Sequence, residues 1–169
     1  GATHFGPDIA RFRVRGSGWG LVDTSGNVLL EPGYERIEKP IDGLARYSQN
    51  HIWGLLNIAG EVVAAPQFKT LKLAPSGVSW GQTTDGLWGA MARDGSWIIE
   101  PHYESAFLKL GSPVIVKKNG KTGLVRLDGT KILEPMFADI YRFNEGLAAY
   151  TADGEQWGLI DTLGQVVVE

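Results

Sequence analysis

The sequence predicts an all-β protein: five repeated three-stranded β-meanders that close into a pseudo-five-fold, barrel-like module. The first observation is composition, because 169 residues include 23 glycines and six tryptophans, and glycine averages roughly 7% of residues in proteins. The second observation is spacing. A Trp-Gly pair, replaced once by Thr-Gly, returns every 34 or 35 residues, as in an internal repeat. The pairs begin at Trp19, Trp53, Trp88, Thr122 and Trp157.

Two further columns share this period. A glycine stands seven residues after the start of each pair, at Gly26, Gly60, Gly95, Gly129 and Gly164. A proline followed two residues later by an aromatic residue comes next, at Pro32, Pro66, Pro101 and Pro135 with Tyr34, Phe68, Tyr103 and Phe137. The repeats are therefore placed at 8–42, 43–76, 77–111, 112–145 and 146–169, within one domain over 1–169 that stands alone or forms part of a longer chain.

Each repeat contains three short runs with strand character. In the second repeat these are 44–47, 53–56 and 61–65, which are too short and too rich in β-branched or aromatic residues for helices. Between the second and third runs, an Asp or Asn first and a Gly fourth indicate a type I turn closed by a left-handed glycine. The glycine after each Trp lies inside a strand, so another backbone or ring is expected to pack closely there. The proline ends the third strand, the aromatic residue packs into the core, and an irregular link follows.

Closure is expected because the last run, 166–168, is as apolar as its internal copies. An exposed strand edge of this kind favours aggregation, and closure removes the edge. A compact barrel is favoured over a small five-bladed β-propeller, because propeller blades usually hold four strands in roughly 40 or more residues. The pair His4-Phe5 resembles His102-Tyr103 and is a candidate for the aromatic residue that the fifth repeat lacks.

The pattern over 19–37, Trp-Gly-Leu-Val-Asp-x-x-Gly-x-Val-Leu-x-Pro-x-Tyr-x-x-Ile, resembles the WG (KWG) repeat of bacterial proteins. The resemblance covers 8–169, with departures at Thr122, which lacks the Trp, and at Ala90, which replaces a leucine. It implies a β-repeat module, often attached to other domains, with no activity common to the family. Together with the absence of cysteine, it suggests a periplasmic or extracellular location in a bacterium, with a cytoplasmic one as the alternative.

Composition excludes several functional classes. The formal charge of -3 argues against a nucleic-acid partner, and without a run of 18 apolar residues no membrane insertion is expected. With no cysteine and no ligand-spaced histidines, no metal site is expected. No catalytic serine motif, phosphate loop or cofactor motif is present. A column of glutamates repeats beside the prolines, which indicates a structural role rather than catalysis, at Glu31, Glu100, Glu134 and Glu169. The sequence therefore predicts no enzyme and no cofactor.

Candidate contact residues are those that depart from their counterparts in the other repeats. Trp80 aligns with Arg11 and Arg46, so its column is expected to face solvent, and Trp97 is expected on the same face. Either the two tryptophans form a recognition surface, or they refill the volume left by Ala90. Two basic clusters are further candidates for an anionic partner surface or are simply solvated: Arg11, Arg13 and Arg15 on one strand face, and Lys117, Lys118 and Lys121 near a hairpin.

These features predict a non-catalytic recognition or scaffolding module that binds another protein. The first alternative is a carbohydrate- or cell-wall-binding module that uses exposed tryptophans. The second alternative is an inhibitor or immunity protein that blocks an enzyme.

Overall fold

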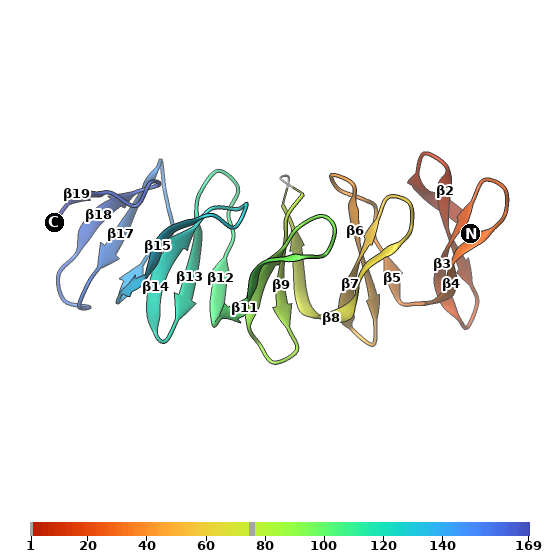
Figure 1. Cartoon of the computed structure of the whole chain (residues 1–169), viewed down its shortest axis with the longest axis horizontal. Helices are drawn as coiled ribbons and strands as arrows, with labels where there is room; N and C mark the ends of the chain where they lie inside the picture. The colour runs from red at the N-terminus through yellow and green to blue at the C-terminus, as the bar shows by residue number, and fades with distance from the viewer. Residues whose placement is uncertain (1, 75–76) are drawn as a thin grey trace. The chain divides into compact units, whose positions relative to one another are not determined.

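The computed structural model describes residues 2–74 and 77–169 (Figure 1). The fold is all-β as predicted: the described residues form 19 strands and no helix, and therefore no helix that could cross a membrane. The chain divides into two compact units, Gly1–Ile98 and Ile99–Glu169. The boundary falls inside a strand, β11 (Trp97–Tyr103), rather than between two repeats.

The first unit contains two antiparallel sheets and the start of β11. Its other strands are β1 (Ala2–Gly6), β2 (Ile9–Val14), β3 (Gly18–Asp23), β4 (Val28–Tyr34), β5 (Arg36–Ile37), β6 (Leu44–Gln49), β7 (Ile52–Asn57), β8 (Val62–Leu73), β9 (Ser79–Thr83) and β10 (Trp88–Met91). The strands β1 to β4 form one sheet, and β5 to β11 form a second sheet in chain order. The second and third meanders share this second sheet because β8 pairs with β7 along its first half and with β9 along its second half.

The second unit contains two four-stranded antiparallel sheets, in which every strand pairs with its neighbour in the chain. The first sheet consists of β12 (Ser105–Phe107), β13 (Val114–Lys118), β14 (Lys121–Val125) and β15 (Lys131–Phe137). The second sheet consists of β16 (Asp139–Ile140), β17 (Leu147–Thr151), β18 (Gly158–Asp161) and β19 (Val166–Val168).

The meanders have four strands, so the prediction of three strands and an irregular link is wrong. The link itself forms a short strand that pairs with the first strand of the next meander, as Ile37 of β5 does with Tyr47 of β6. The burial of Ile37 explains this strand: its side chain lies in the core, and this holds the backbone of β5 beside β6. Four strands therefore fit into 34 or 35 residues, and the length argument against propeller blades fails, since such blades are four-stranded sheets.

The predicted barrel does not form within either unit, because the sheets of the described residues are open and end in edge strands. The five-fold closure therefore stays a prediction. His4 pairs with Ala10, so β1 serves as the fourth strand of the first meander, and Phe5 packs into that core. At the other terminus all three valines of β19 are exposed.

The two glycine columns have the roles that their spacing predicts. In the hairpin of the first meander, Gly26 has a φ of 88° and its N–H donates to the Asp23 carbonyl. The strand column requires close approach, since a Cβ on Gly54 would lie 2.5 Å from the ring of Tyr47 and 2.7 Å from the carbonyl oxygen of Ala64. Any larger side chain at Gly54 would separate the ring from the strand.

The aromatic residues that follow the prolines pack inward, as predicted. Phe68 and Tyr103 are buried, and the half-buried Tyr34 and Phe137 belong to the cores of their units. Tyr34 meets the edge of Tyr47 with ring centroids 5.0 Å apart. Phe137 meets the edge of Tyr150 in the same way, at 4.9 Å, so at these two positions the aromatic residue packs against the following meander within the same unit.

Candidate binding pocket on the second meander

The structure separates the two candidate tryptophans. Trp80 pairs across the strands with Ala90, as predicted, but its exposed fraction is 0%. Its predicted place on a recognition surface is therefore wrong, and burial beside the small Ala90 agrees with the alternative that it fills volume. Trp97 is half-buried and lies edge-on to Phe68, with ring centroids 6.0 Å apart. A partner contact through Trp97 stays a prediction.

The reason for the error at Trp80 is the role of the aligned arginines. Arg11 donates from Nη1 to the carbonyl oxygen of Ile37 at 2.6 Å, and Arg46 donates likewise to Leu71 at 2.6 Å. Both arginines are half-buried and tie the first strand of one meander to the linking strand of the next. The column therefore faces a neighbouring meander rather than solvent.

The basic clusters are placed differently from one another. Arg11 is engaged in the bond just described, and Arg15 lies beyond the end of β2, so the prediction of three arginines on one strand face is wrong. Arg13 and Arg15 are exposed.

The lysines meet as expected at the β13–β14 hairpin, where Lys118 stands opposite Lys121 and Lys117 precedes them, all exposed. A role of either cluster in binding a partner stays a prediction.

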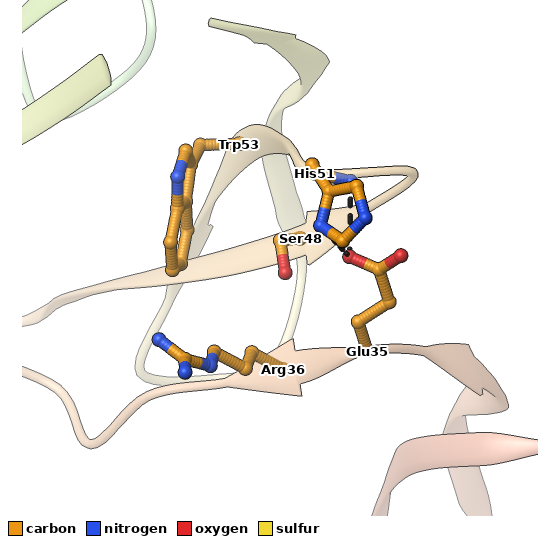
Figure 2. A pocket seen from close by; sticks show the side chains of 5 residues that line it. All are labelled: Glu35, Arg36, Ser48, His51 and Trp53. Carbon is orange, nitrogen blue, oxygen red and sulfur yellow. Dashed lines mark hydrogen bonds and ion pairs between the residues drawn. The ribbon is translucent and has the colours of Figure 1, made fainter. Parts of the chain in front are cut away.

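A pocket of about 440 Å³ opens on the second meander, within the first unit. Its lining residues are Glu35, Arg36, Ser48, His51 and Trp53 (Figure 2). Ser48 ends near the middle of the view, between the indole of Trp53 and the imidazole of His51. The pocket therefore combines an aromatic wall with hydrogen-bond donors and one carboxylate.

The histidine of this pocket sits in an unusual backbone conformation. Asn50 and His51 form the two-residue loop between β6 and β7, with φ values of 50° and 62°. Such tight loops need two residues with positive φ, for which Asn-Gly is the preferred pair. The equivalent loop of the fourth meander is Asn119-Gly120, with φ values of 51° and 72°. His51 thus occupies a position that its counterpart gives to glycine.

A glutamate holds this loop in place. The His51 backbone N–H donates to Oε2 of Glu35 at 3.0 Å, and the same oxygen lies 3.6 Å from Nδ1 of the ring. In the fourth meander, Gly120 N–H donates to Oε2 of Glu104 at 3.3 Å. Glu35 therefore has a structural role that is repeated in the chain, whereas the imidazole is found only at the pocket.

The indole of Trp53 packs against Arg46, which forms an ion pair with Glu38. The guanidinium carbon of Arg46 lies 4.9 Å from the Trp53 ring centroid, a cation–π distance. Arg46 also donates from Nε and Nη2 to Oε2 of Glu38, at 2.9 and 2.6 Å. The charge of Arg46 is thereby compensated, and the indole is fixed as a wall of the pocket.

Two polar groups of the pocket remain available. Arg36 is exposed and makes no ion pair with the described residues, and Ser48 is 3% exposed with no hydrogen bond from its hydroxyl to them. A seryl nucleophile would need a hydrogen bond to a base, and no such bond joins Ser48 to His51 within the described part of the chain. The described residues likewise hold no cluster of three metal-ligating side chains. The arrangement is suited to binding through donors and an aromatic face.

The sequence holds a signal for this pocket outside the repeated columns. His51 departs from the glycine at its counterpart position, and Arg36 aligns with Ser105 and Asp139. The departure of a tryptophan or of a basic run is visible in the sequence itself. The departure in a two-residue loop becomes visible only once the pairing of its flanking strands is known.

An exposed aromatic pair in the second unit was also missed. Tyr141 and Trp157 stack with ring centroids 4.9 Å apart and an interplanar angle of 3°. They are 54% and 44% exposed. Trp157 belongs to the repeated tryptophan column, and for that reason it was assigned to the framework.

The repeated Trp-Gly meander, with its turn glycine and inward aromatic residue, defines a class of β-repeat protein. A family model for the WG containing repeat matches residues 19–50, 88–108 and 123–155, together about half of the chain. The chain belongs to the WG-repeat family.

The solved structures that the chain resembles are distant from it. Hsv2 from Kluyveromyces lactis is 10% identical, with a TM-score of 0.48, over 97% of this chain and 61% of that one. Its variant with loop 6CD replaced by a Gly-Ser linker is 14% identical, with a TM-score of 0.44, over 73% and 46%. PorZ from Porphyromonas gingivalis is 10% identical, with a TM-score of 0.43, over 96% and 24%. The chain thus spans about half the length of the Hsv2 structures. No curated protein sequence matches it.

Proposed function

We propose that this WG-repeat chain is a non-catalytic recognition module that binds another protein through the pocket of its second meander. The observation that carries the proposal is that this meander departs from its counterparts at residues that line the pocket. Its turn, its glycine columns and its glutamate cap repeat elsewhere in the chain, whereas Arg36 and His51 do not. Residues that a framework does not need are the first candidates for contact with a partner.

The chemistry of the pocket supports binding rather than turnover. Trp and Arg are the residue types enriched where protein interfaces concentrate their binding energy. Trp53 is fixed by Arg46, so little conformational entropy is lost when a partner packs against it. The hydroxyl of Ser48 and the imidazole of His51 supply directional hydrogen bonds beside that wall.

The test is capture of a partner by the immobilised chain from an extract of the organism that encodes it. We expect one stoichiometric partner that is retained by Arg126→Ala, an exposed charge of the second unit that does not line the pocket, and lost with the double substitution Arg36→Ala/His51→Gly. Equal recovery on all three proteins would refute the pocket as the binding site. The periplasmic or extracellular location stays a prediction, which cell fractionation with an antibody to the chain would test.

A carbohydrate-binding function is the second candidate, and the stacked pair Tyr141 and Trp157 favours it. Exposed aromatic rings that stack in parallel leave an outer ring face that is flat and apolar, on which a sugar ring can stack. Titration with soluble glycans should then shift tryptophan fluorescence, and Tyr141→Ala should abolish the shift without lowering the unfolding midpoint. A fluorescence response that survives Tyr141→Ala would contradict this assignment.

A further inference from the structure

Three groups that can donate hydrogen bonds line the pocket of the second meander: the guanidinium of Arg36, the hydroxyl of Ser48 and the imidazole of His51. Figure 2 shows the guanidinium on the Trp53 side of Ser48 and the imidazole on the other side. We infer that these groups bind a single side-chain carboxylate, from an Asp or Glu of an extended partner segment, while Trp53 packs against an aromatic or apolar residue beside it. This inference rests on the proposed function and names the chemistry of the partner.

Ser48 gives the first argument. Ser48 is 3% exposed and lines the pocket, and its hydroxyl has no hydrogen bond to the described residues. Its oxygen is not one of the fully inaccessible side-chain atoms that lack a partner, so the hydroxyl can be reached from the pocket. An acceptor oxygen placed in the pocket can therefore accept a hydrogen bond from it, beside Trp53 and His51 (Figure 2).

Arg36 gives the second argument. It lies on the two-residue strand β5, and its side chain is exposed at the pocket with no ion pair among the described residues. Its counterparts in the second unit are the neutral Ser105 and the acidic Asp139. A guanidinium presents parallel N–H groups in the geometry that a carboxylate accepts. The cation is therefore specific to this meander.

The charge balance of the pocket favours a monoanion. Glu35 is a carboxylate already committed to the His51 loop, and the nearby Arg46 is neutralised by Glu38. Arg36 is the one fixed cation and Glu35 the one fixed anion among the lining residues, so Glu35 opposes a doubly charged phosphate about twice as strongly as a singly charged carboxylate. A monoanion that pairs with Arg36 is therefore favoured over a dianion.

The experiment uses the whole chain and two matched dipeptides, acetyl-Tyr-Glu-amide and acetyl-Tyr-Gln-amide. Two-dimensional NMR follows the backbone amide of His51, the Nε–H of Arg36 and the indole N–H of Trp53 during titration. We expect saturable shifts with the glutamate peptide and at least tenfold weaker binding of its neutral glutamine isostere. Arg36→Ala should weaken binding of the glutamate peptide by about tenfold or more, as for other charge-assisted hydrogen bonds, whereas Arg126→Ala, which removes an exposed charge of the second unit, should leave it unchanged.

Three results would overturn the inference. These are equal binding of the two dipeptides, shifts that avoid the pocket, and tighter binding of acetyl-Tyr-phosphoserine-amide than of the glutamate peptide. Unchanged unfolding midpoints of the variants exclude misfolding as the cause of lost binding. If the unsubstituted chain does not bind the glutamate peptide and the Arg36→Ala variant still captures the partner, protein binding survives and the carboxylate assignment fails.

Discussion

Replacing His51 by glycine should stabilise the fold while it removes a group from the pocket. His51 has a φ of 62°, in the left-handed region, and its counterpart Gly120 has a φ of 72° in the same kind of loop. A non-glycine residue there costs about 1–2 kcal/mol. Glycine also lowers stability by about 0.4–1 kcal/mol, because it gives the unfolded chain more conformational freedom. The net gain expected for His51→Gly is about 0.5–1 kcal/mol, from relief of strain.

The bond that fixes the loop should survive this substitution. Glu35 accepts from the backbone N–H of His51, and Glu104 accepts from that of Gly120 in the same way. The glycine variant therefore loses the imidazole and keeps the cap. Chemical denaturation and calorimetry measure the effect, and the unfolding midpoint should rise by about 2 °C for a chain of this size.

The chain offers a matched control of opposite sign in Gly120→His. No atom lies within 4 Å of a Cβ built on Gly120, so the substitution meets open space and only the backbone conformation opposes it. Stability should fall by about 0.5–1 kcal/mol. The reasoning is wrong if His51→Gly lowers the unfolding midpoint while Gly120→His leaves it unchanged.

Two further predictions concern the hairpins. The side-chain hydrogen bond from Asn27 and the N–H groups of the turn lower the pKa of Asp23 below 3.8. The stability that this carboxylate adds is therefore complete above the unfolded pKa of about 3.9, and it is lost as the pH falls through the lower folded pKa. Asp23→Asn should keep the turn, since Asn57 forms the same turn in the second meander. The variant should lose less stability between pH 6 and pH 2 in denaturation followed by circular dichroism, and an unchanged pH profile would contradict the assignment. Lys118 and Lys121 stand directly opposite each other, and Lys121→Glu should add about 0.5 kcal/mol in urea denaturation at low salt, a gain that high salt should reduce; a loss of stability at low salt would count against this pairing.

The parts of the fold that repeat were predictable from the sequence. The hairpin turn needs a glycine in the left-handed region, as at Gly26, and the second strand needs a glycine where an aromatic ring packs against it, as at Gly54. Few residues can replace either glycine, so both positions recur in the repeats and can be recognised in the sequence. The linking strand was missed because two residues, Arg36 and Ile37, are too few to display the alternation that identifies a strand. Its existence depends on pairing with β6, which is a tertiary contact.

The candidate site was less predictable for a related reason. A column that holds arginine predicts a solvent-facing position, but the guanidinium of Arg11 donates to a carbonyl of the next meander. The same pattern predicts Trp80 at the surface, whereas the structure buries it. A charged residue in one repeat therefore indicates exposure only after the partners of its charge are known.

Arg46 links the pocket to the framework, and this decides which substitutions can test function. Its guanidinium lies against the Trp53 ring, pairs with Glu38 and donates to the carbonyl of Leu71 at the linking strand of the next meander. Removing Arg46 would leave Glu38 without its cation, remove the cation–π contact with Trp53 and remove the hydrogen bond that joins the two meanders. Loss of binding in such a variant would not distinguish a lost contact from a loosened framework. Arg36 makes none of these bonds, so its removal tests the pocket alone.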